Sequence, residues 1–148
     1  MTIIKKIAAA ETYSVRLPVL RKGKPMESCR FDGDDLETTQ HFGFYLNRKL
    51  VGIISLFRNN SPSFSEKKQC QIRGMAVLEC HRKKDFGRAL INHSEKDCKD
   101  HEVDLIWFNA RMEATGFYEK MGYQKKGIPF DIPDVGEHIV MFKKNKND

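Results

Sequence analysis

The stretch Gln71–Ile91, with the sequence QIRGMAVLECHRKKDFGRALI, decides the fold because it joins a strand, a basic turn and a helix. Its first part carries the apolar, partly β-branched side chains of a buried strand: Ile72, Met75, Val77 and Leu78. His81-Arg82-Lys83-Lys84 then places positive charge directly before Gly87 and a helical pattern. Free backbone N–H groups and the positive end of a helix dipole both favour a phosphate at such a turn. Considered alone, the segment also fits an ordinary solvated surface turn.

The length and charge of the chain limit its class. Its 148 residues are enough for one compact domain, which we expect over residues 1–148 with a frayed basic tail at about 143–148. The net charge of +6 points to acidic small molecules, phosphates or nucleic acid as partners. No apolar run approaches the roughly 20 residues that span a bilayer, and the N-terminus lacks the apolar core of a signal peptide. A cytoplasmic location is therefore expected.

The cysteines and histidines give no sign of a metal site. The four cysteines are widely spaced and form no C-x-x-C pair: Cys29, Cys70, Cys80 and Cys98. Zinc sites need closer clustering, and disulfide frameworks need an oxidising compartment. We therefore expect reduced structural thiols and no metal cofactor.

The remaining segments predict a mixed sheet with helices. Strands are expected over 2–7, 41–46, 50–57, 70–78, 103–108, 123–130 and 137–143, and helices over 9–20, 86–99 and 110–121. Pro18 must end or bend the first helix, and Asn47-Arg48-Lys49 joins two strands as a hairpin. The acidic cluster at 32–35 is expected to be a solvated turn. The order predicts a three-layer α/β fold, with a parallel strand–helix–strand unit around 70–108 and ligands beyond the strands' carboxyl ends.

Two motifs in the C-terminal half resemble the GNAT superfamily of N-acetyltransferases. The first comprises Met75-Ala76-Val77 and Arg82 through Gly87. The second comprises Asn109 with Gly116-Phe117-Tyr118-Glu119-Lys120-Met121-Gly122-Tyr123. The closing Phe130-Asp131-Ile132-Pro133, with Gly136 and His138, is similar to a bacterial branch of that superfamily. The resemblance covers roughly residues 70–142.

The resemblance implies an acyl-CoA N-acyltransferase fold with a splayed central strand pair and acetyl-CoA as co-substrate. It implies that the pantetheine arm pairs with the backbone of Met75, Ala76 and Val77, and that an N–H near Ala76 stabilises the oxyanion. It places the pyrophosphate in the turn formed by Arg82, Lys83, Lys84, Asp85, Phe86, Gly87 and Arg88. It makes Tyr118 the general acid and Asn109 a contact of the cofactor arm, although Asn109 would equally serve as an N-cap for the next helix.

The chain departs from the family pattern at two positions. Asp85 stands where the first glycine of the pyrophosphate turn is expected, which adds a Cβ and a negative charge beside phosphate. Asp tolerates the left-handed conformation better than most residues, so we expect binding to persist but weaken. Gln71 occupies the position of a glutamate that serves some members as general base. A water chain, Glu79, Glu137 or His138 remain open as replacements.

Three functions compete at this stage. The leading one is acetyl transfer from acetyl-CoA to the amine of a small molecule or a protein. The resemblance also implies that the enzyme could be a homodimer. The second is a regulatory domain that binds acyl-CoA without turnover. A nucleic-acid-binding module is the third, but the aromatic residues are not interleaved with the basic ones. The acceptor stays unnamed; Arg21, Arg30 and Arg73 could pair with a carboxylate on it, or could be solvated or structural.

Overall fold

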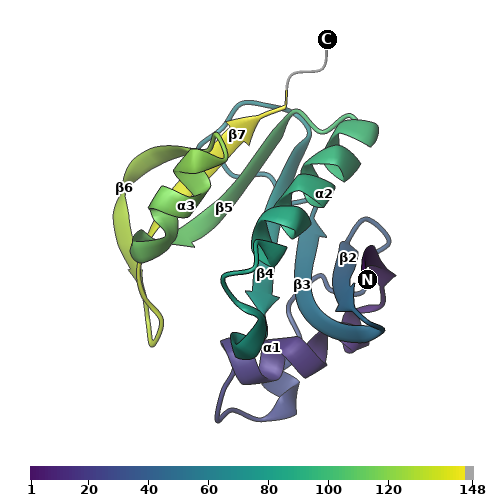
Figure 1. The fold of residues 1–148 in the computed structure, drawn as a ribbon. Helices are drawn as coiled ribbons and strands as arrows, with labels where there is room; N and C mark the ends of the chain where they lie inside the picture. The colour runs from purple at the N-terminus through teal and green to yellow at the C-terminus, as the bar shows by residue number, and fades with distance from the viewer. Residues whose placement is uncertain (146–148) are drawn as a thin grey trace. The chain divides into compact units, whose positions relative to one another are not determined.

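The computed structural model describes residues 1–145, and its contacts divide the chain into two compact units. Unit 1 contains residues 1–58 and 72–97, and unit 2 contains residues 59–71 and those from 98 onward. The strands follow the order β1-β2-β3-β4-β5-β7-β6 in one mixed, seven-stranded sheet (Figure 1). The expected mixed sheet with helices is therefore confirmed.

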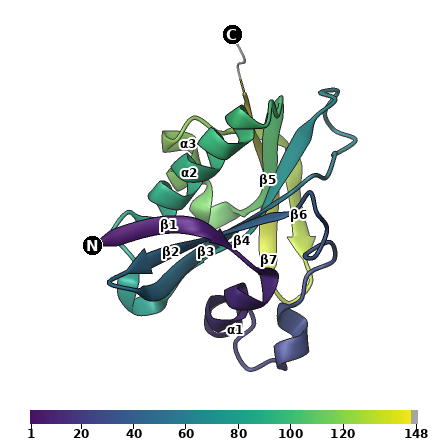
Figure 2. The ribbon, with the colours of Figure 1, turned by 90° about the vertical axis from the view of Figure 1, so that its right-hand side faces the viewer.

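The strands of unit 1 form an antiparallel arrangement (Figure 2). β1 (Thr2–Ile7) pairs with β2 (Gln40–Leu46), and β2 pairs with β3 (Lys49–Phe57). The hairpin loop contains only Asn47 and Arg48, at φ 48° and 72°, so the expected three-residue turn was one residue too long. Two successive left-handed residues are what a tight hairpin turn requires. β4 (Gln69–Val77) starts in unit 2 and continues in unit 1 from Ile72.

The first helical region of unit 1 consists of short pieces. A 3₁₀ turn, η1 (Ala9–Thr12), leads into α1 (Tyr13–Leu20), where a single helix over 9–20 was expected. Pro18 lies inside α1, which continues two residues beyond it before ending. A second 3₁₀ turn, η2 (Met26–Cys29), is the single helical turn in the polar loop that follows.

The core of unit 1 is apolar, with one charged cluster inside it. A buried group is formed by Ile7, Val15, Ile53 and Ala76. The helix α2 spans Phe86–Asp100, close to the predicted range of 86–99, and its Leu90 and Ile91 are also fully buried. Ser94 lies on the same buried stripe, and its hydroxyl donates to the carbonyl of Leu90 at 2.8 Å. The polar member of the stripe is thus satisfied within the helix.

The acidic cluster at 32–35 is not a solvated turn throughout, because Asp34 is buried. Its carboxylate accepts two hydrogen bonds from Arg16, at 2.7 and 3.0 Å, and a third from the amide of Phe31. Arg16 is itself fully buried and also donates to the Cys29 carbonyl and the Ser55 hydroxyl. A cluster of acidic residues in a loop does not indicate which of them will meet a cation on a helix elsewhere in the chain. The sequence therefore could not predict this pair.

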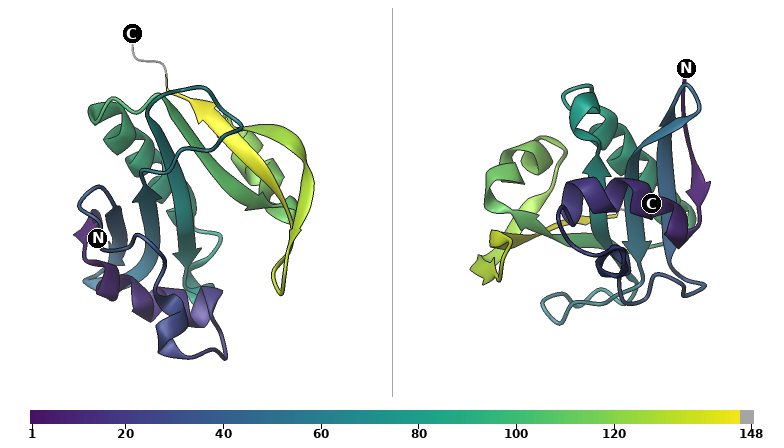
Figure 3. Two further views of the ribbon diagram at one scale, coloured as in Figure 1. Left: turned by 180° about the vertical axis from the view of Figure 1, so that it is seen from behind. Right: turned by 90° about the horizontal axis from the view of Figure 1, so that it is seen from below.

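Unit 2 is built around a β-ladder that continues from β4. Gln69–Gln71 pair in parallel with β5 (Leu105–Arg111), which confirms the predicted parallel unit. β5 pairs antiparallel with β7 (Gly136–Lys144), and β7 pairs with β6 (Gln124–Ile132) in a hairpin (Figure 3). The loop at 59–68 is fastened by the buried side chain of Gln69, whose amide contacts the backbone of Ser61, Phe64 and Glu66.

The helix expected from Ala110 begins later. Ala110 belongs to β5, opposite Ile139 of β7, and only a 3₁₀ turn, η4 (Met112–Ala114), precedes α3 (Thr115–Lys120). The helical spacing of Ala110 with later residues was therefore coincidental, because strand pairing with β7 takes precedence over local pattern. β7 likewise retains Lys143 and Lys144, which were expected in a frayed tail; residues 146–148 of that tail lie outside the described part.

Within residues 1–145, no helix combines the length and the apolar character that a membrane crossing requires.

Candidate functional site

β4 has a kink at Gly74, in the middle of the strand. Gly74 has φ +64°, and a Cβ there would lie 2.9 Å from the ring of Phe31. Both the left-handed conformation and the close contact exclude a side chain at this position. The parallel ladder to β5 already ends at Gln71 and Trp107. The kink thus sets the course of Met75, Ala76 and Val77, the predicted pantetheine-binding residues.

The turn after β4 is anchored at its start by backbone contacts. The amide of Leu78 donates to the carbonyl of Val51 at 2.8 Å, and a 3₁₀ turn, η3 (Glu79–His81), follows. The side chain of Arg82 turns back to donate from Nε to the carbonyl of Val77 at 3.3 Å. These contacts fix the segment that leads to the N-terminus of α2.

The backbone amides of Lys83 to Arg88 have no acceptor among residues 1–145. The first hydrogen bond of α2 joins the Ala89 amide to the carbonyl of Asp85, at 3.1 Å. Lys83 and Asp85 are both left-handed, with φ 65° and 61°, and the side chains of Arg82 through Asp85 are exposed. Successive unpaired N–H groups before a helix, surrounded by cations, are the chemistry of a phosphate site.

Asp85 adopts the conformation that the expected glycine would have supplied, as predicted for an aspartate at this position. Its carboxylate forms no ion pair with Lys83 or Lys84 in the described structure. The turn therefore keeps its shape, while one negative charge stays beside the free amides.

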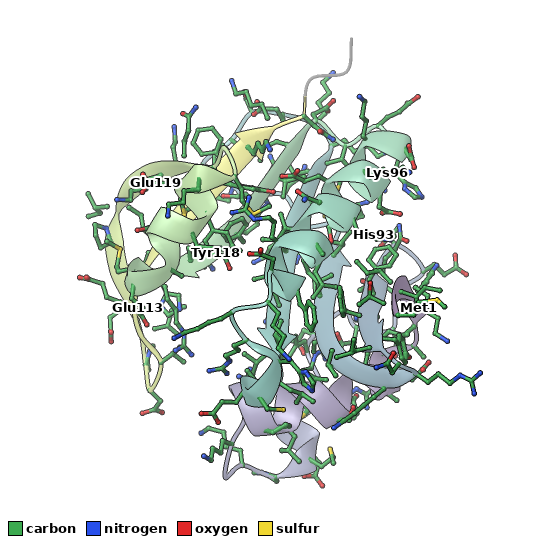
Figure 4. The ribbon with its side chains drawn as sticks, in the orientation of Figure 1. Met1, His93, Lys96, Glu113, Tyr118 and Glu119 are labelled. Carbon is green, nitrogen blue, oxygen red and sulfur yellow. The ribbon has the colours of Figure 1, made fainter. Side chains whose placement is uncertain are left out.

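Tyr118 is fixed in unit 2 by the C-terminal end of α3 (Figure 4). The Tyr123 amide donates to the Tyr118 carbonyl at 3.1 Å and the Gly122 amide to the Glu119 carbonyl at 3.0 Å, with Gly122 at φ 95°. These are the two bonds of a Schellman cap, in which Gly122 is the left-handed residue. The ring of Tyr118 packs 4.6 Å from that of Phe108, between centroids.

The hydroxyl of Tyr118 forms no hydrogen bond within residues 1–145. Burial raises the pKa of this phenol to about 12, because the charged phenolate is poorly solvated there. The group consequently keeps its proton over the whole physiological range. A protonated hydroxyl without an internal partner is available to donate a hydrogen bond to a ligand.

Asn109 lies within β5 and does not cap a helix. It is exposed and stands opposite Val140 of β7, whereas α3 begins only at Thr115. The N-cap alternative for Asn109 is therefore wrong, and its side chain stays available for another role.

The candidates for the general base have unequal surroundings. The side-chain oxygen of Gln71 accepts a hydrogen bond from Asn59 at 2.9 Å, and Glu79 and Glu137 are exposed. His138 is buried, and its Nδ1–H donates to the carbonyl of Gly136 at 2.8 Å. That bond gives His138 a structural role in β7.

The three arginines proposed for an acceptor carboxylate separate clearly in the structure. Arg30 forms an exposed ion pair with Asp35 at 3.3 Å, and Arg21 donates to the carbonyls of Leu20 and Ser28. The guanidinium of Arg73 forms no hydrogen bond or ion pair with any residue from 1 to 145. It is the one arginine of the three whose N–H donors remain open.

The predicted site residues fall into two groups. Unit 1 holds the strand residues 75–77 and the turn residues 82–88, whereas unit 2 holds Asn109 and Tyr118. Sequence reasoning overlooked Gly74 and its contact Phe31; a lone glycine inside a strand pattern was the available signal for a kink. Within the described residues, no three His, Cys, Asp or Glu side chains gather as a metal site would require.

Comparisons with known proteins identify the family of the chain. Residues 8–123 match the family model described as "Acetyltransferase (GNAT) family". The chain is 36% identical over 143 residues to the N-acetyltransferase YitI of Bacillus subtilis strain 168, covering 97% of this chain and 96% of that protein.

Solved structures show the same fold at lower identity. A ribosomal-protein-alanine N-acetyltransferase from Escherichia coli aligns with a TM-score of 0.78 and 17% identity, over 100% of this chain and 96% of its own. An aminoglycoside N-acetyltransferase complexed with coenzyme A aligns with a TM-score of 0.77 and 14% identity, over 99% and 98% of the two chains. The family model and the similarity to YitI establish that the chain belongs to the acetyltransferase (GNAT) family, whose reaction transfers an acetyl group from acetyl-CoA to an amine.

Proposed function

We propose that Met75–Val77, Arg82–Arg88, Asn109 and Tyr118 carry out the transfer of an acetyl group from acetyl-CoA to an amine. In this proposal the turn Arg82–Arg88 holds the pyrophosphate of acetyl-CoA. The observation that supports this most strongly is the set of amides from Lys83 to Arg88, which have no acceptor in residues 1–145. Backbone N–H groups and a helix N-terminus bind phosphate without needing any particular side chain. The cations Lys83, Lys84 and Arg88 add attraction, which Asp85 partly offsets.

The reactive end of acetyl-CoA lies, in this proposal, against Met75, Ala76 and Val77. A neutral amine attacks the thioester carbon, and the resulting oxyanion accepts a hydrogen bond from the backbone N–H of Ala76. Collapse of the tetrahedral species breaks the carbon–sulfur bond and releases CoA as a thiolate. The amine's extra proton leaves to solvent, because the structure offers no carboxylate at Gln71.

Tyr118 assists the departing sulfur. A thiol has a pKa of roughly 8.5, whereas burial raises the pKa of Tyr118 to about 12. Complete proton transfer from Tyr118 to the thiolate would be unfavourable by roughly three pKa units. Tyr118 therefore stabilises the thiolate by donating a hydrogen bond, and the thiol acquires its proton from water. Asn109, exposed on β5, contacts the cofactor arm in the same proposal.

The family model spans residues of both units, which supports a single N-acetyltransferase domain. The four free cysteines fit a reducing compartment and support activity in the cytoplasm. The exposed apolar side chains of Ile128 and Phe130 on edge strand β6 support a homodimer, which light scattering on the purified chain would test.

The deciding experiment measures CoA release by chromatography with acetyl-CoA and a panel of amines, amino acids, polyamines and peptides. Release with at least one amine supports the proposal. Binding of acetyl-CoA by calorimetry, without release for any amine, would instead identify a regulatory CoA-binding domain. The variant Lys83→Ala/Lys84→Ala should weaken acetyl-CoA binding, whereas Lys5→Ala/Lys6→Ala, on β1, should not.

A further inference from the structure

Arg73 occupies an unusual position for a charged side chain. It is half-buried on β4, and its guanidinium lies 4.9 Å from the ring centroid of Phe31 and 5.3 Å from that of Phe57. No described residue accepts a hydrogen bond from it or forms an ion pair with it. The two rings hold the planar group and leave its five N–H donors without a protein acceptor.

Arg16 shows what the same environment does when the chain supplies partners. Its guanidinium lies 3.9 Å from the centroid of the same Phe31 ring and forms hydrogen bonds to Asp34, Ser55 and the Cys29 carbonyl. A guanidinium withdrawn from water needs such acceptors, because desolvating an unpaired charge is costly. Arg73 has been withdrawn in part without receiving them.

The charges around Arg73 do not neutralise it from within. Burial and the positive charge of Arg16 lower the pKa of Arg73 from its usual value, whereas Asp34 and Asp32 act in the opposite direction. Asp34 is already committed to Arg16, and Asp32 is exposed on the loop. An additional anion beside Arg73 would therefore be stabilised.

The position of Arg73 in the strand relates it to the reaction. It directly precedes the kink at Gly74 and stands three residues before Ala76, whose N–H is proposed for the oxyanion. Three residues of fully extended strand would cover roughly 10 Å, and the left-handed Gly74 between Arg73 and Ala76 makes that length an upper limit. A small molecule with an amine at the thioester and an anionic group within about that distance would reach both.

We propose that Arg73 binds a carboxylate on the acceptor, so that the substrate is a small amine that also carries a carboxylate. A guanidinium and a carboxylate form two parallel charge-assisted hydrogen bonds, which matches the open donors. This inference rests on the proposed acetyl transfer and narrows its acceptor class.

The test uses matched acceptors that differ only in their charge. CoA release is measured with glycine and glycinamide, β-alanine and β-alaninamide, and γ-aminobutyrate and γ-aminobutyramide. At the favoured chain length, kcat/KM for the acid should exceed that for the amide by about tenfold or more. Equal rates for acids and amides, or a preference for O-phosphoethanolamine over every carboxylate, would overturn the proposal.

Variants assign the preference to Arg73. Arg73→Gln should reduce the acid-to-amide ratio to about one, and Arg73→Lys should give an intermediate ratio because it keeps the charge but not the paired donors. Arg30→Gln makes the same change of charge at the exposed pair with Asp35 and should leave the ratio as in the wild type. A ratio that survives in Arg73→Gln would refute the assignment.

Binding measurements keep this inference separate from the proposed function. If no amine supports CoA release, the transfer proposal fails; calorimetry with γ-aminobutyrate and CoA still tests Arg73. Binding of the amino acid that is lost in Arg73→Gln supports the carboxylate site, and binding that is unchanged, or absent from the wild type, overturns it. A loss of acetyl-CoA affinity in Arg73→Gln as large as its loss of activity would also overturn it, by assigning Arg73 to the cofactor.

Discussion

Two charged regions of unit 1 differ in whether the chain supplies their partners. Arg16 and Asp34 are both buried, and every hydrogen bond on the Asp34 carboxylate comes from within the unit. The turn from Lys83 to Arg88 is largely exposed and its amides have no internal acceptor. The first region is satisfied within the fold, whereas the second leaves donors open for the proposed ligand. The pairing of a polar group, more than its charge, thus separates structural positions from candidate functional positions here.

The strongest test of this comparison breaks the buried pair. Arg16→Met leaves the Asp34 carboxylate buried without its cation, which should cost about 3–5 kcal/mol of the free energy of unfolding. Urea unfolding measures the loss. The double variant Arg16→Met/Asp34→Leu should recover much of it, because no charge then stays unpaired. Arg30→Gln, at an exposed pair, serves as the control and should change little.

Tyr118 combines a paired backbone with an unpaired side chain. Its carbonyl accepts a hydrogen bond in the cap of α3, whereas its hydroxyl has no hydrogen-bond partner within residues 1–145. Tyr118→Phe should therefore lower kcat by about a hundredfold and leave stability and acetyl-CoA affinity nearly unchanged. Steady-state CoA release and calorimetry provide the two readouts. Tyr123→Phe, in the same aromatic cluster, is the matched control. Full turnover in Tyr118→Phe would remove this residue from the mechanism.

The pyrophosphate turn should improve when Asp85 is replaced. Asp85→Gly removes a negative charge and relieves the left-handed backbone, so acetyl-CoA should bind about three- to tenfold more tightly in calorimetry. Asp134→Gly relieves an equally left-handed residue, at φ 65°, in the β6–β7 turn and should leave this affinity unchanged. Unchanged or weaker binding in Asp85→Gly contradicts the phosphate assignment of the turn.

The smallest expected effect is a pH dependence of stability from Asp34. Burial alone would raise its pKa, but the hydrogen bonds from Arg16 and the Phe31 amide outweigh burial and lower the pKa. A lowered pKa contributes stability that is complete above the unfolded value of about 4 and is lost as the pH falls through the folded value. Thermal unfolding between pH 6 and about pH 2 should show this loss. Asp34→Asn should flatten that limb, whereas Asp35→Asn should retain it.

The sequence located β4, its basic turn and α2 because their signals are local. Alternating apolar residues, a run of cations and a glycine are properties of neighbouring positions. The prediction failed at Ala110, where the spacing favoured a helix but pairing with Ile139 of β7 kept the chain extended. It also failed at Asp34, where a contact 18 positions away along the sequence reversed the expected exposure.

By itself, the sequence determined the family, the order of most elements and the residues of the candidate site, since motif spacing and periodicity survive without any knowledge of distant contacts. Only the tertiary structure decided which of those groups have partners. It paired Arg16 with Asp34 and Arg30 with Asp35. It left Arg73 beside the rings of Phe31 and Phe57, and it placed Asn109 in a strand, away from the start of α3. Partners come from segments that are remote in sequence and meet only when the chain packs, so no local pattern encodes them.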